Sequence, residues 1–370
     1  MNQPNNLKVL GLMSGTSMDG LDMCLAEIKI AENYSFNYKI MKSVSEPFQV
    51  QTKTIIQNAI DGKNIEIAHT HLGKLFSQLC TKHFDSEKID AIAMHGQTIN
   101  HEDGVMTHQI GDPQFLAETF QIPIIYNFRQ ADINVGGNGA PLMPFLDWLL
   151  FNNSSDDQII LNIGGIANFT HIPQHLKKGD IIGFDTGPGM ALIDEFCKLK
   201  WNEACDWDGK YSSTGKIIEP LLAEMMKHPF VKKEYPKSTG RDEFGGKFVK
   251  KIVGDWDMYP PENILRTFVA FTAKSIYENI LKLRNFTPEN STLIVSGGGV
   301  HHPIIMEDLK RYTQLKVMDS TEMDIDPDTK EALLMAVIGG CRLKNLTANM
   351  PSVTGAKSHV VLGDIYQRNE

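Results

Sequence analysis

The order of apolar and polar positions predicts a chain of alternating strands and helices. Residues 7–30, LKVLGLMSGTSMDGLDMCLAEIKI, place two apolar runs around a small polar turn, which predicts a strand, a loop and a second strand. Residues 158–171, QIILNIGGIANFTH, repeat this pattern around a double glycine. Period-two alternation over residues 34–45 predicts a further strand. Helical spacing of apolar residues predicts helices at 49–61, 65–84, 190–199, 216–227, 262–284 and 329–343.

Several apolar runs end in short polar segments that contain glycine. The run 89–94 precedes His95-Gly96-Gln97-Thr98, and the run 291–296 precedes Gly297-Gly298-Gly299. Open α/β sheets bind ligands at the carboxyl ends of their strands. We therefore expect Gln97 and Thr98 to contact a ligand, whereas His95 is either a contact or a satisfied core histidine. The triple glycine is typical of a nucleotide site between a strand and a helix.

The turn between the first two strands has the chemistry of a phosphate loop. Gly15 allows a ligand to approach the backbone closely, since it has no Cβ. Thr16 and Ser17 offer hydroxyls, and successive backbone N–H groups in such a turn bind anions. Asp19 and Asp22 could hold a divalent cation or its waters. The alternative is a simple β-hairpin, because hairpin turns use the same residue types.

Two charged residues follow the short apolar run 122–126. Arg129 suits bidentate recognition of a carboxylate or phosphate, with Asp132 beside it. The alternative is a structural ion pair between these two residues. The glycine-rich segment 136–139 is the best candidate for a domain junction.

Asp185 ends another apolar run, in the segment Asp-Thr-Gly-Pro-Gly. It precedes the predicted helix 190–199, where partial positive charge favours an anion. The alternative role for Asp185 is a helix N-cap. The loop 236–246 carries Lys237 and Arg241, which either contact phosphate or are solvated charges.

The length, net charge and cysteine content of the chain argue against several classes of protein. A chain of 370 residues is expected to form two domains. The net charge of −9 argues against nucleic acid as a partner. The five cysteines lack CxxC spacing and are odd in number, so we expect neither a zinc site nor a disulfide framework, but reduced thiols in the cytoplasm. We expect no signal peptide and no membrane-spanning segment.

These motifs resemble a known family. The two strand–turn–strand segments, DTGPG and GGG resemble the actin, Hsp70 and sugar-kinase superfamily. More closely, nine motifs in order over nearly the whole chain resemble the anhydro-N-acetylmuramic acid kinase family. They are GLMSGTSMDGLD, HGQT (95–98), QIGD (109–112), FRQAD (128–132), GGNGAPL (136–142), NIGGIAN (162–168), DTGPG (185–189), KSTGR (237–241) and GGG (297–299).

The resemblance implies a fold and an activity. The fold is α/β, with two ribonuclease H-like domains facing each other across a cleft. Domain I would comprise residues 1–137 plus 346–370, and domain II residues 138–345. The implied activity opens the 1,6-anhydro ring of anhydro-N-acetylmuramic acid with water while ATP, with Mg²⁺, phosphorylates O6, giving N-acetylmuramic acid 6-phosphate and ADP in cell-wall recycling. A cytoplasmic homodimer is implied too, with an amino sugar as its small-molecule partner and no membrane or nucleic acid.

The resemblance also implies roles for individual residues. Asp185 would be the general base, and Asp19 would hold Mg²⁺ through water. The sugar would be positioned by Gln97, Thr98, Arg129, Asp132 and Glu331. The nucleotide would be bound by Gly15, Thr16, Ser17, Met18, Asp19, Gly20, Leu21, Asp22, Gly164, Gly165, Gly187, Gly297, Gly298 and Gly299.

The chain departs from the family pattern at three places. Met190 and His302 stand where the family commonly has Asn, and Leu334-Met335-Ala336 replaces a common Ala-Phe-Ala run. These departures leave room for a diverged kinase that acts on another sugar or anhydro-sugar. A different class of alternative is a non-catalytic, ATP-binding relative of the chaperone type.

Overall fold

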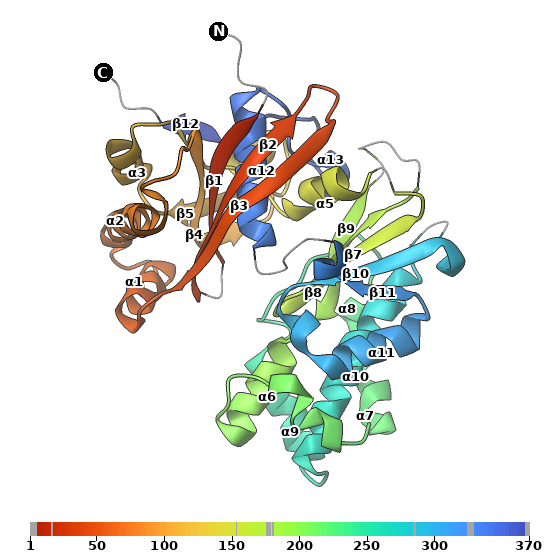
Figure 1. The fold of residues 1–370 in the computed structure, drawn as a ribbon. Helices are drawn as coiled ribbons and strands as arrows, with labels where there is room; N and C mark the ends of the chain where they lie inside the picture. Colours follow the sequence, from red (N-terminus) through yellow and green to blue (C-terminus); the bar gives the residue numbers. More distant parts are fainter. Residues whose placement is uncertain are drawn as a thin grey trace. The chain divides into compact units, whose positions relative to one another are not determined.

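The computed structural model describes residues 6–15, 18–152, 154–174, 179, 181–283, 286–323 and 329–366. The chain forms two compact units, Met1–Leu150 with Asp328–Glu370, and Phe151–Pro327. Each unit contains one sheet covered by helices (Figure 1). Each is described by itself below.

The sheet of the first unit has the order β12-β6-β4-β1-β2-β3, and β5 pairs with β4. β1, β2 and β3 are antiparallel neighbours, whereas β4 is parallel to β1 and β6 is parallel to β4. The bounds are β1 Leu7–Ser14, β2 Gly20–Ile30, β3 Phe36–Pro47, β4 Ala91–Glu102, β5 Met106–Ile110, β6 Ile124–Tyr126 and β12 Asp364–Tyr366.

Helices pack against this sheet, and β1 shows how its two faces differ. Val9 and Gly11 point towards α12, where a Cβ on Gly11 would lie 2.0 Å from the Ala332 carbonyl oxygen. Leu10 and Leu12 alternate with them and join the core formed with α1 and α2. The helices are α1 Val50–Ile60, α2 Ile65–Phe84, α3 Pro113–Phe120, α4 Gln130–Asn134, α5 Met143–Phe151, α12 Lys330–Leu343 and α13 Pro351–Thr354.

The sheet of the second unit has the order β11-β10-β7-β8-β9. β7, β8 and β9 are antiparallel, and β10 and β11 run parallel to β7. The strands are β7 Asp157–Ile163, β8 Ile166–Ile172, β9 Ile182–Pro188, β10 Ser291–Ser296 and β11 Lys316–Asp319. In both units, therefore, three antiparallel strands are followed by two strands parallel to the first. This is the ribonuclease H-like topology, and it confirms the expected fold class.

The core of the second unit centres on α10, whose Phe268, Phe271 and Ile276 are fully buried. Phe268 packs edge to face on Phe196 of α6. The helical segments are α6 Ala191–Trp201, η2 Trp207–Gly209, η3 Ser212–Thr214, α7 Glu219–Met225, α8 Pro229–Lys232, α9 Gly246–Trp256, α10 Pro261–Ile280, η4 Pro288–Asn290, η5 Gly298–His301, α11 Pro303–Thr313 and η6 Ser320–Met323.

Two local predictions were wrong. The strand predicted to end at Met94 continues as β4 to Glu102, because β5 pairs with the extension and Gly96 takes a positive φ of 78°. Asp185 does not stand at the start of a helix: it lies inside β9, opposite Asn168 of β8, and α6 begins only at Ala191.

The compact units differ from the predicted domain boundaries. Residues 138–150 and 328–345 belong to the first unit, because α5 buries Phe145 and Leu146 and α12 packs on β1, β2 and β4. The glycine-rich segment 136–139 accordingly lies within the first unit.

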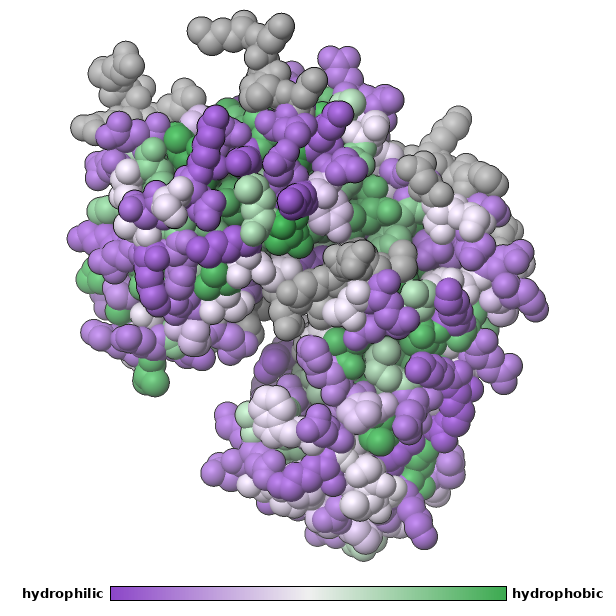
Figure 2. Space-filling model, viewed as in Figure 1, coloured by the Kyte–Doolittle hydropathy of each residue, from purple (hydrophilic) through white to green (hydrophobic). Residues whose placement is uncertain are grey.

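Hydrophilic side chains cover much of the face drawn in Figure 2, with smaller hydrophobic areas between them. Within the described ranges, no helix combines the length and apolar character that a membrane span requires.

Candidate active site

The turn between β1 and β2 is hydrogen-bonded to Gln97 of β4. The Ser14 hydroxyl donates to Gln97 Oε1 at 2.5 Å, and Gln97 Nε2 donates to the Gly15 carbonyl oxygen at 3.1 Å. Gln97 and Ser14 are buried. Gln97 therefore holds the turn in place, a role that its predicted sugar contact did not include. Thr16 and Ser17 lie outside the described residues.

The other residues predicted for this loop differ in accessibility. Asp19 is 79% exposed and lies 3.7 Å from the Lys53 amine. A Cβ on Gly20 would lie 2.3 Å from the Glu46 carbonyl oxygen, so glycine is needed there for the approach of β3. Leu21 is buried in the core, so its side chain is turned away from any ligand. Met18 closes the turn, with its N–H donating to the Gly15 carbonyl.

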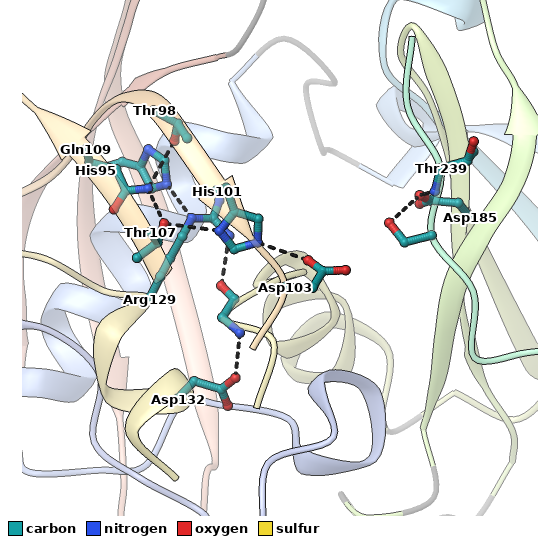
Figure 3. A network of polar contacts seen from close by, with 12 residues as sticks. His95, Thr98, His101, Asp103, Thr107, Gln109, Arg129, Asp132, Asp185 and Thr239 are labelled. Atoms are coloured by element: carbon teal, nitrogen blue, oxygen red, sulfur yellow. Dashed lines mark hydrogen bonds and ion pairs between the residues drawn. The ribbon is translucent and has the colours of Figure 1, made fainter. Parts of the chain in front are cut away.

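His95 is a satisfied core histidine that supports Arg129. Its Nδ1 contacts the Gly96 carbonyl oxygen at 2.9 Å, and Arg129 Nε donates to its Nε2 at 3.0 Å (Figure 3). These partners assign the imidazole proton to Nδ1. Burial, and then the Arg129 charge, lower the pKa of His95 to about 3, so the ring stays neutral.

Arg129 and Asp132 meet at Gly139 instead of pairing with each other. Arg129 Nη1 donates to the Gly139 carbonyl oxygen at 2.9 Å, and the Gly139 N–H donates to Asp132 Oδ2 at 2.9 Å. Asp132 Oδ1 accepts from Asn349 and Thr354 at 2.8 and 2.9 Å, and the side chain is fully buried. Within the described residues, Asp132 therefore joins the glycine-rich segment to the C-terminal part of the unit.

The Glu331 carboxyl group lies within electrostatic range of both the Asp22 carboxylate and the Arg129 guanidinium. Glu331 lies in the first turn of α12, where the helix dipole favours a negative charge. Part of the residue is exposed to solvent. Burial of its carboxyl group nevertheless raises the pKa of Glu331, and the Asp22 carboxylate raises this pKa further. The positive charge of Arg129 lowers it. The Ser45 hydroxyl donates to Asp22. Thr98 is held separately, accepting from Gln109 Nε2 at 3.2 Å.

Asp185 in the second unit is held by the loop that follows α8. Its Oδ2 accepts from the Ser238 hydroxyl at 3.1 Å and from the Thr239 N–H at 2.9 Å (Figure 3). The residue is half-buried. Two donors to one oxygen favour the ionised carboxylate, which a general base requires. The N-cap interpretation was wrong, because Met190 occupies the N-cap position of α6.

The double-glycine turn between β7 and β8 receives the start of α6. The Gly165 carbonyl oxygen accepts from the N–H groups of Gly189 and Ala191 at 2.9 and 3.0 Å, and the Gly164 carbonyl accepts from Met190 at 2.8 Å. A Cβ on Gly165 would lie 3.1 Å from the Arg241 guanidinium. The turn is thus bordered by one positive side chain.

The glycines that were predicted to bind the nucleotide differ in the space around them. A Cβ on Gly297 would lie 2.6 Å from Asn162 Oδ1, and one on Gly299 would lie 2.3 Å from Ile163 Cγ2. A Cβ on Gly298 would meet no atom within 4 Å. Gly298 is therefore the member of this turn with open space beside its backbone. Gly187 has a φ of 134° and lies against Ser275 of α10.

His302 supplies the cap that its neighbour helix needs. Its Nδ1 accepts from the Ile305 N–H at 3.3 Å, at the start of α11, and its Nε2 lies 3.2 Å from Asp206 Oδ2. Both side chains of this pair are buried. A histidine can thus replace a shorter capping residue there. Met190, by contrast, makes no side-chain cap and packs on the core.

The sequence analysis did not identify several residues that hold the predicted site residues in position. Ser14, Asn349, Thr354, Ser238 and Thr239 each hold a predicted site residue. The KSTGR motif was a signal for the last two, because a Ser-Thr-Gly loop offers hydroxyl and amide donors together. Nothing in the local sequence around Asn349 or Thr354 marks them as partners of Asp132.

The described side chains contain no group of three or more His, Cys, Asp or Glu that could hold a metal ion. A site that needs only one protein carboxylate is still compatible with the structure. Mg²⁺ commonly takes one or two carboxylates and completes its shell with water and substrate phosphates. The exposed carboxylate of Asp19, beside an anion-binding type of turn, fits such a role.

Two ribonuclease H-like units, each with a glycine turn at the ends of its strands, define the actin, Hsp70 and sugar-kinase class of α/β proteins. The model of the family described as anhydro-N-acetylmuramic acid kinase matches residues 7–368. Proteins named anhydro-N-acetylmuramic acid kinase from Bacillus cereus (strain Q1) and Bacillus thuringiensis subsp. konkukian (strain 97-27) are 34% identical, over 96% of this chain and 98% of theirs. The chain belongs to the anhydro-N-acetylmuramic acid kinase family.

Solved structures show a more distant likeness. A ROK family protein from Streptococcus pneumoniae TIGR4 in complex with sucrose is 11% identical, covering 90% of this chain and 97% of that one, with a TM-score of 0.38. A ROK family glucokinase from Streptomyces griseus in complex with glucose and AMPPNP is 10% identical, covering 89% and 97%, with a TM-score of 0.37.

Proposed function

We propose that this protein opens the 1,6-anhydro ring of anhydro-N-acetylmuramic acid with water and transfers the γ-phosphoryl group of ATP to O6. The products are N-acetylmuramic acid 6-phosphate and ADP. Membership of the kinase family supports the reaction class. The observation that carries the mechanism is the Asp185 carboxylate, held on β9 by two hydrogen-bond donors.

The proposed chemistry needs one base. A water oxygen bonds to C1 while its proton passes to Asp185, and the bond between C1 and O6 breaks. O6 then bonds to the γ-phosphorus as the bond to the β-phosphate oxygen breaks, and ADP leaves. A positioned general base contributes about 10²–10⁴-fold to such a step. Asp185 returns its proton to solvent after the products leave.

In the first unit, Thr98, Arg129 and Glu331 are proposed to contact the sugar. Arg129 keeps its position because His95 and Gly139 already bind its Nε and Nη1. We assign Gln97 and Asp132 to positioning: both are buried, and Gln97 holds the β1–β2 turn while Asp132 holds Gly139. This refines the sugar-contact role that the family resemblance implied for them.

ATP is proposed to place its phosphates against the β1–β2 turn and the 164–165 turn, and its adenosine against Gly298. Asp19 would hold Mg²⁺, through water. Bound Mg²⁺ would neutralise charge on the transferred phosphoryl group. A cytoplasmic location and a homodimer, both implied by the family resemblance, belong to the same proposal.

One measurement tests the function. Purified protein is incubated with ATP, Mg²⁺ and 1,6-anhydro-N-acetylmuramic acid in water enriched in ¹⁸O, and the sugar product is analysed by mass spectrometry. We expect one ¹⁸O at C1 and a phosphate on O6. Asp185→Asn is expected to lower turnover by about 10²–10⁴-fold, because the amide cannot accept the proton.

The other outcomes separate the alternatives. Phosphorylation of a free hydroxyl without label at C1 would indicate a diverged sugar kinase. Nucleotide binding without sugar-dependent ADP release, unchanged in Asp185→Asn, would indicate the non-catalytic relative.

A further inference from the structure

The Oδ2 atom of Asp185 accepts hydrogen bonds from a loop of the same unit that is distant in the sequence. The donors are the Ser238 hydroxyl and the Thr239 N–H, 3.1 and 2.9 Å away. These residues follow Asp185 by more than fifty positions, so the contact is made by folding and not by the local strand. The site residues assigned from the family resemblance include neither Ser238 nor Thr239.

We propose that Ser238 and Thr239 are positioning residues that hold the Asp185 carboxylate in its ionised form and in one orientation for proton transfer. This inference rests on the proposed function, since it assigns the two residues to the same general base. The physical reason is geometric. A carboxylate on a strand can rotate about its side-chain bonds, and two donors converging on one oxygen restrict that rotation.

The loop that supplies the donors is itself fixed at several points. The Asp185 N–H donates to the Lys237 carbonyl oxygen at 3.2 Å, so backbone and side chain of Asp185 bind consecutive residues of the loop. The Lys237 amine is buried and donates to the Phe230 carbonyl oxygen at 2.9 Å. The Thr239 hydroxyl donates to Glu243 Oε2 at 2.5 Å. A loop anchored on both sides of Ser238 can present its donors at constant positions.

Charges on the surrounding elements stay the same when Ser238 is changed, so a change in pH dependence reports on the removed donor. The titratable groups on the elements packed against β9 are His171 of β8, Lys232 of α8, and Glu262, Arg266, Lys274, Tyr277 and Glu278 of α10. The loop adds Lys233, Glu234, Tyr235, Lys237, Arg241, Asp242 and Glu243.

The experiment compares the pH dependence of kcat/KM for wild type, Ser238→Ala and Ser238→Thr between about pH 5 and 9. Ser238→Ala removes one donor to the charged form of the base, so its acid limb is expected to move to higher pH by about half a unit. Its kcat is expected to fall about tenfold, within the contribution of a positioned base. Ser238→Thr keeps the hydroxyl and is expected to restore both quantities.

Ser213→Ala, at an exposed serine of η3 in the same unit, is the matched control and is expected to keep the wild-type profile. Thermal unfolding of each variant is measured alongside. An unshifted profile and unchanged kcat in Ser238→Ala would overturn the proposal, as would a loss that Ser238→Thr fails to restore. Asp185→Asn in the same assay separates the two levels: if that variant stays active, the assignment of the base itself is wrong.

Discussion

Arg129 and Asp132 are three positions apart, and their local sequence left two interpretations open: substrate contacts or an ion pair. In the folded chain both side chains bind Gly139, one through its carbonyl oxygen and the other through its N–H. Each charged side chain is therefore hydrogen-bonded to the Gly139 backbone, and the two charges do not neutralise each other. Arg129 can present the rest of its guanidinium to an anionic or polar ligand.

His95 leads to a prediction about acid stability. Its pKa is about 3 in the folded protein and near 6.5 in an unfolded chain, so between these values the unfolded state binds the proton and the folded state does not. Stability should therefore fall as pH drops through this window, by up to about 1.4 kcal/mol per pH unit from this group. His95→Gln keeps an acceptor for Arg129 and does not titrate.

The measurement is the free energy of unfolding in urea at several values between about pH 4 and 7. The advantage of wild type over His95→Gln should shrink as pH falls. A difference that stays constant with pH would contradict the assigned burial of a neutral ring. His301→Gln, at an exposed histidine in the other unit, is the control.

At the scale of elements, long periodic segments were predictable and strand ends were not. The predicted helix 65–84 and α2 coincide, because side-chain burial on one helix face dominates its spacing. β4 extends beyond Met94 because its residues 97–102 pair with β5. The polar sequence there does not predict this pairing. Similarly, Asp185 belongs to β9 because β8 pairs with it.

The triple-glycine turn gives an element-scale prediction. Gly297→Ala and Gly299→Ala should each destabilise the protein by about 1–3 kcal/mol, because the added Cβ would overlap Asn162 or Ile163. Gly298→Ala should leave stability within about 0.5 kcal/mol, since open space lies beside it. It should nevertheless weaken ATP binding if adenosine approaches that backbone.

Thermal unfolding and calorimetric titration with ATP measure the two effects separately. Equal loss of stability in all three variants would contradict the open space at Gly298. Unchanged ATP affinity in Gly298→Ala would remove this residue from the proposed nucleotide site.

At the scale of the whole molecule, one buried ion pair lies near both places where the chain passes between units. Lys330, the first residue of α12, lies 2.6 Å from Asp147 of α5, and the two side chains are 4% and 2% exposed. The chain leaves the first unit after Leu150 and returns at Asp328. The pair therefore joins the departing segment to the returning one and fixes the helix start that carries Glu331.

Asp147→Asn should destabilise the protein by about 3–5 kcal/mol, because it leaves the Lys330 ammonium buried without its charge partner. The double variant Asp147→Leu with Lys330→Met removes both charges and should recover much of that loss. Urea unfolding of the single and double variants measures both values. A single variant as stable as wild type would show that the pair is not buried in solution.

The sequence by itself determined the apolar periodicity of most helices and strands, the family, and which polar residues could carry chemistry, because these depend on residues close together in the chain. Only the tertiary structure decided which of those polar residues are already bound by the protein. Asp132 contacts Asn349, 217 positions away, and Asp185 contacts Ser238, 53 positions away. The division at Leu150 and Asp328 was decided in the same way, because helix α12 belongs to the sheet on which it packs. Such contacts join segments that are far apart in the chain, so no local sequence pattern predicts them.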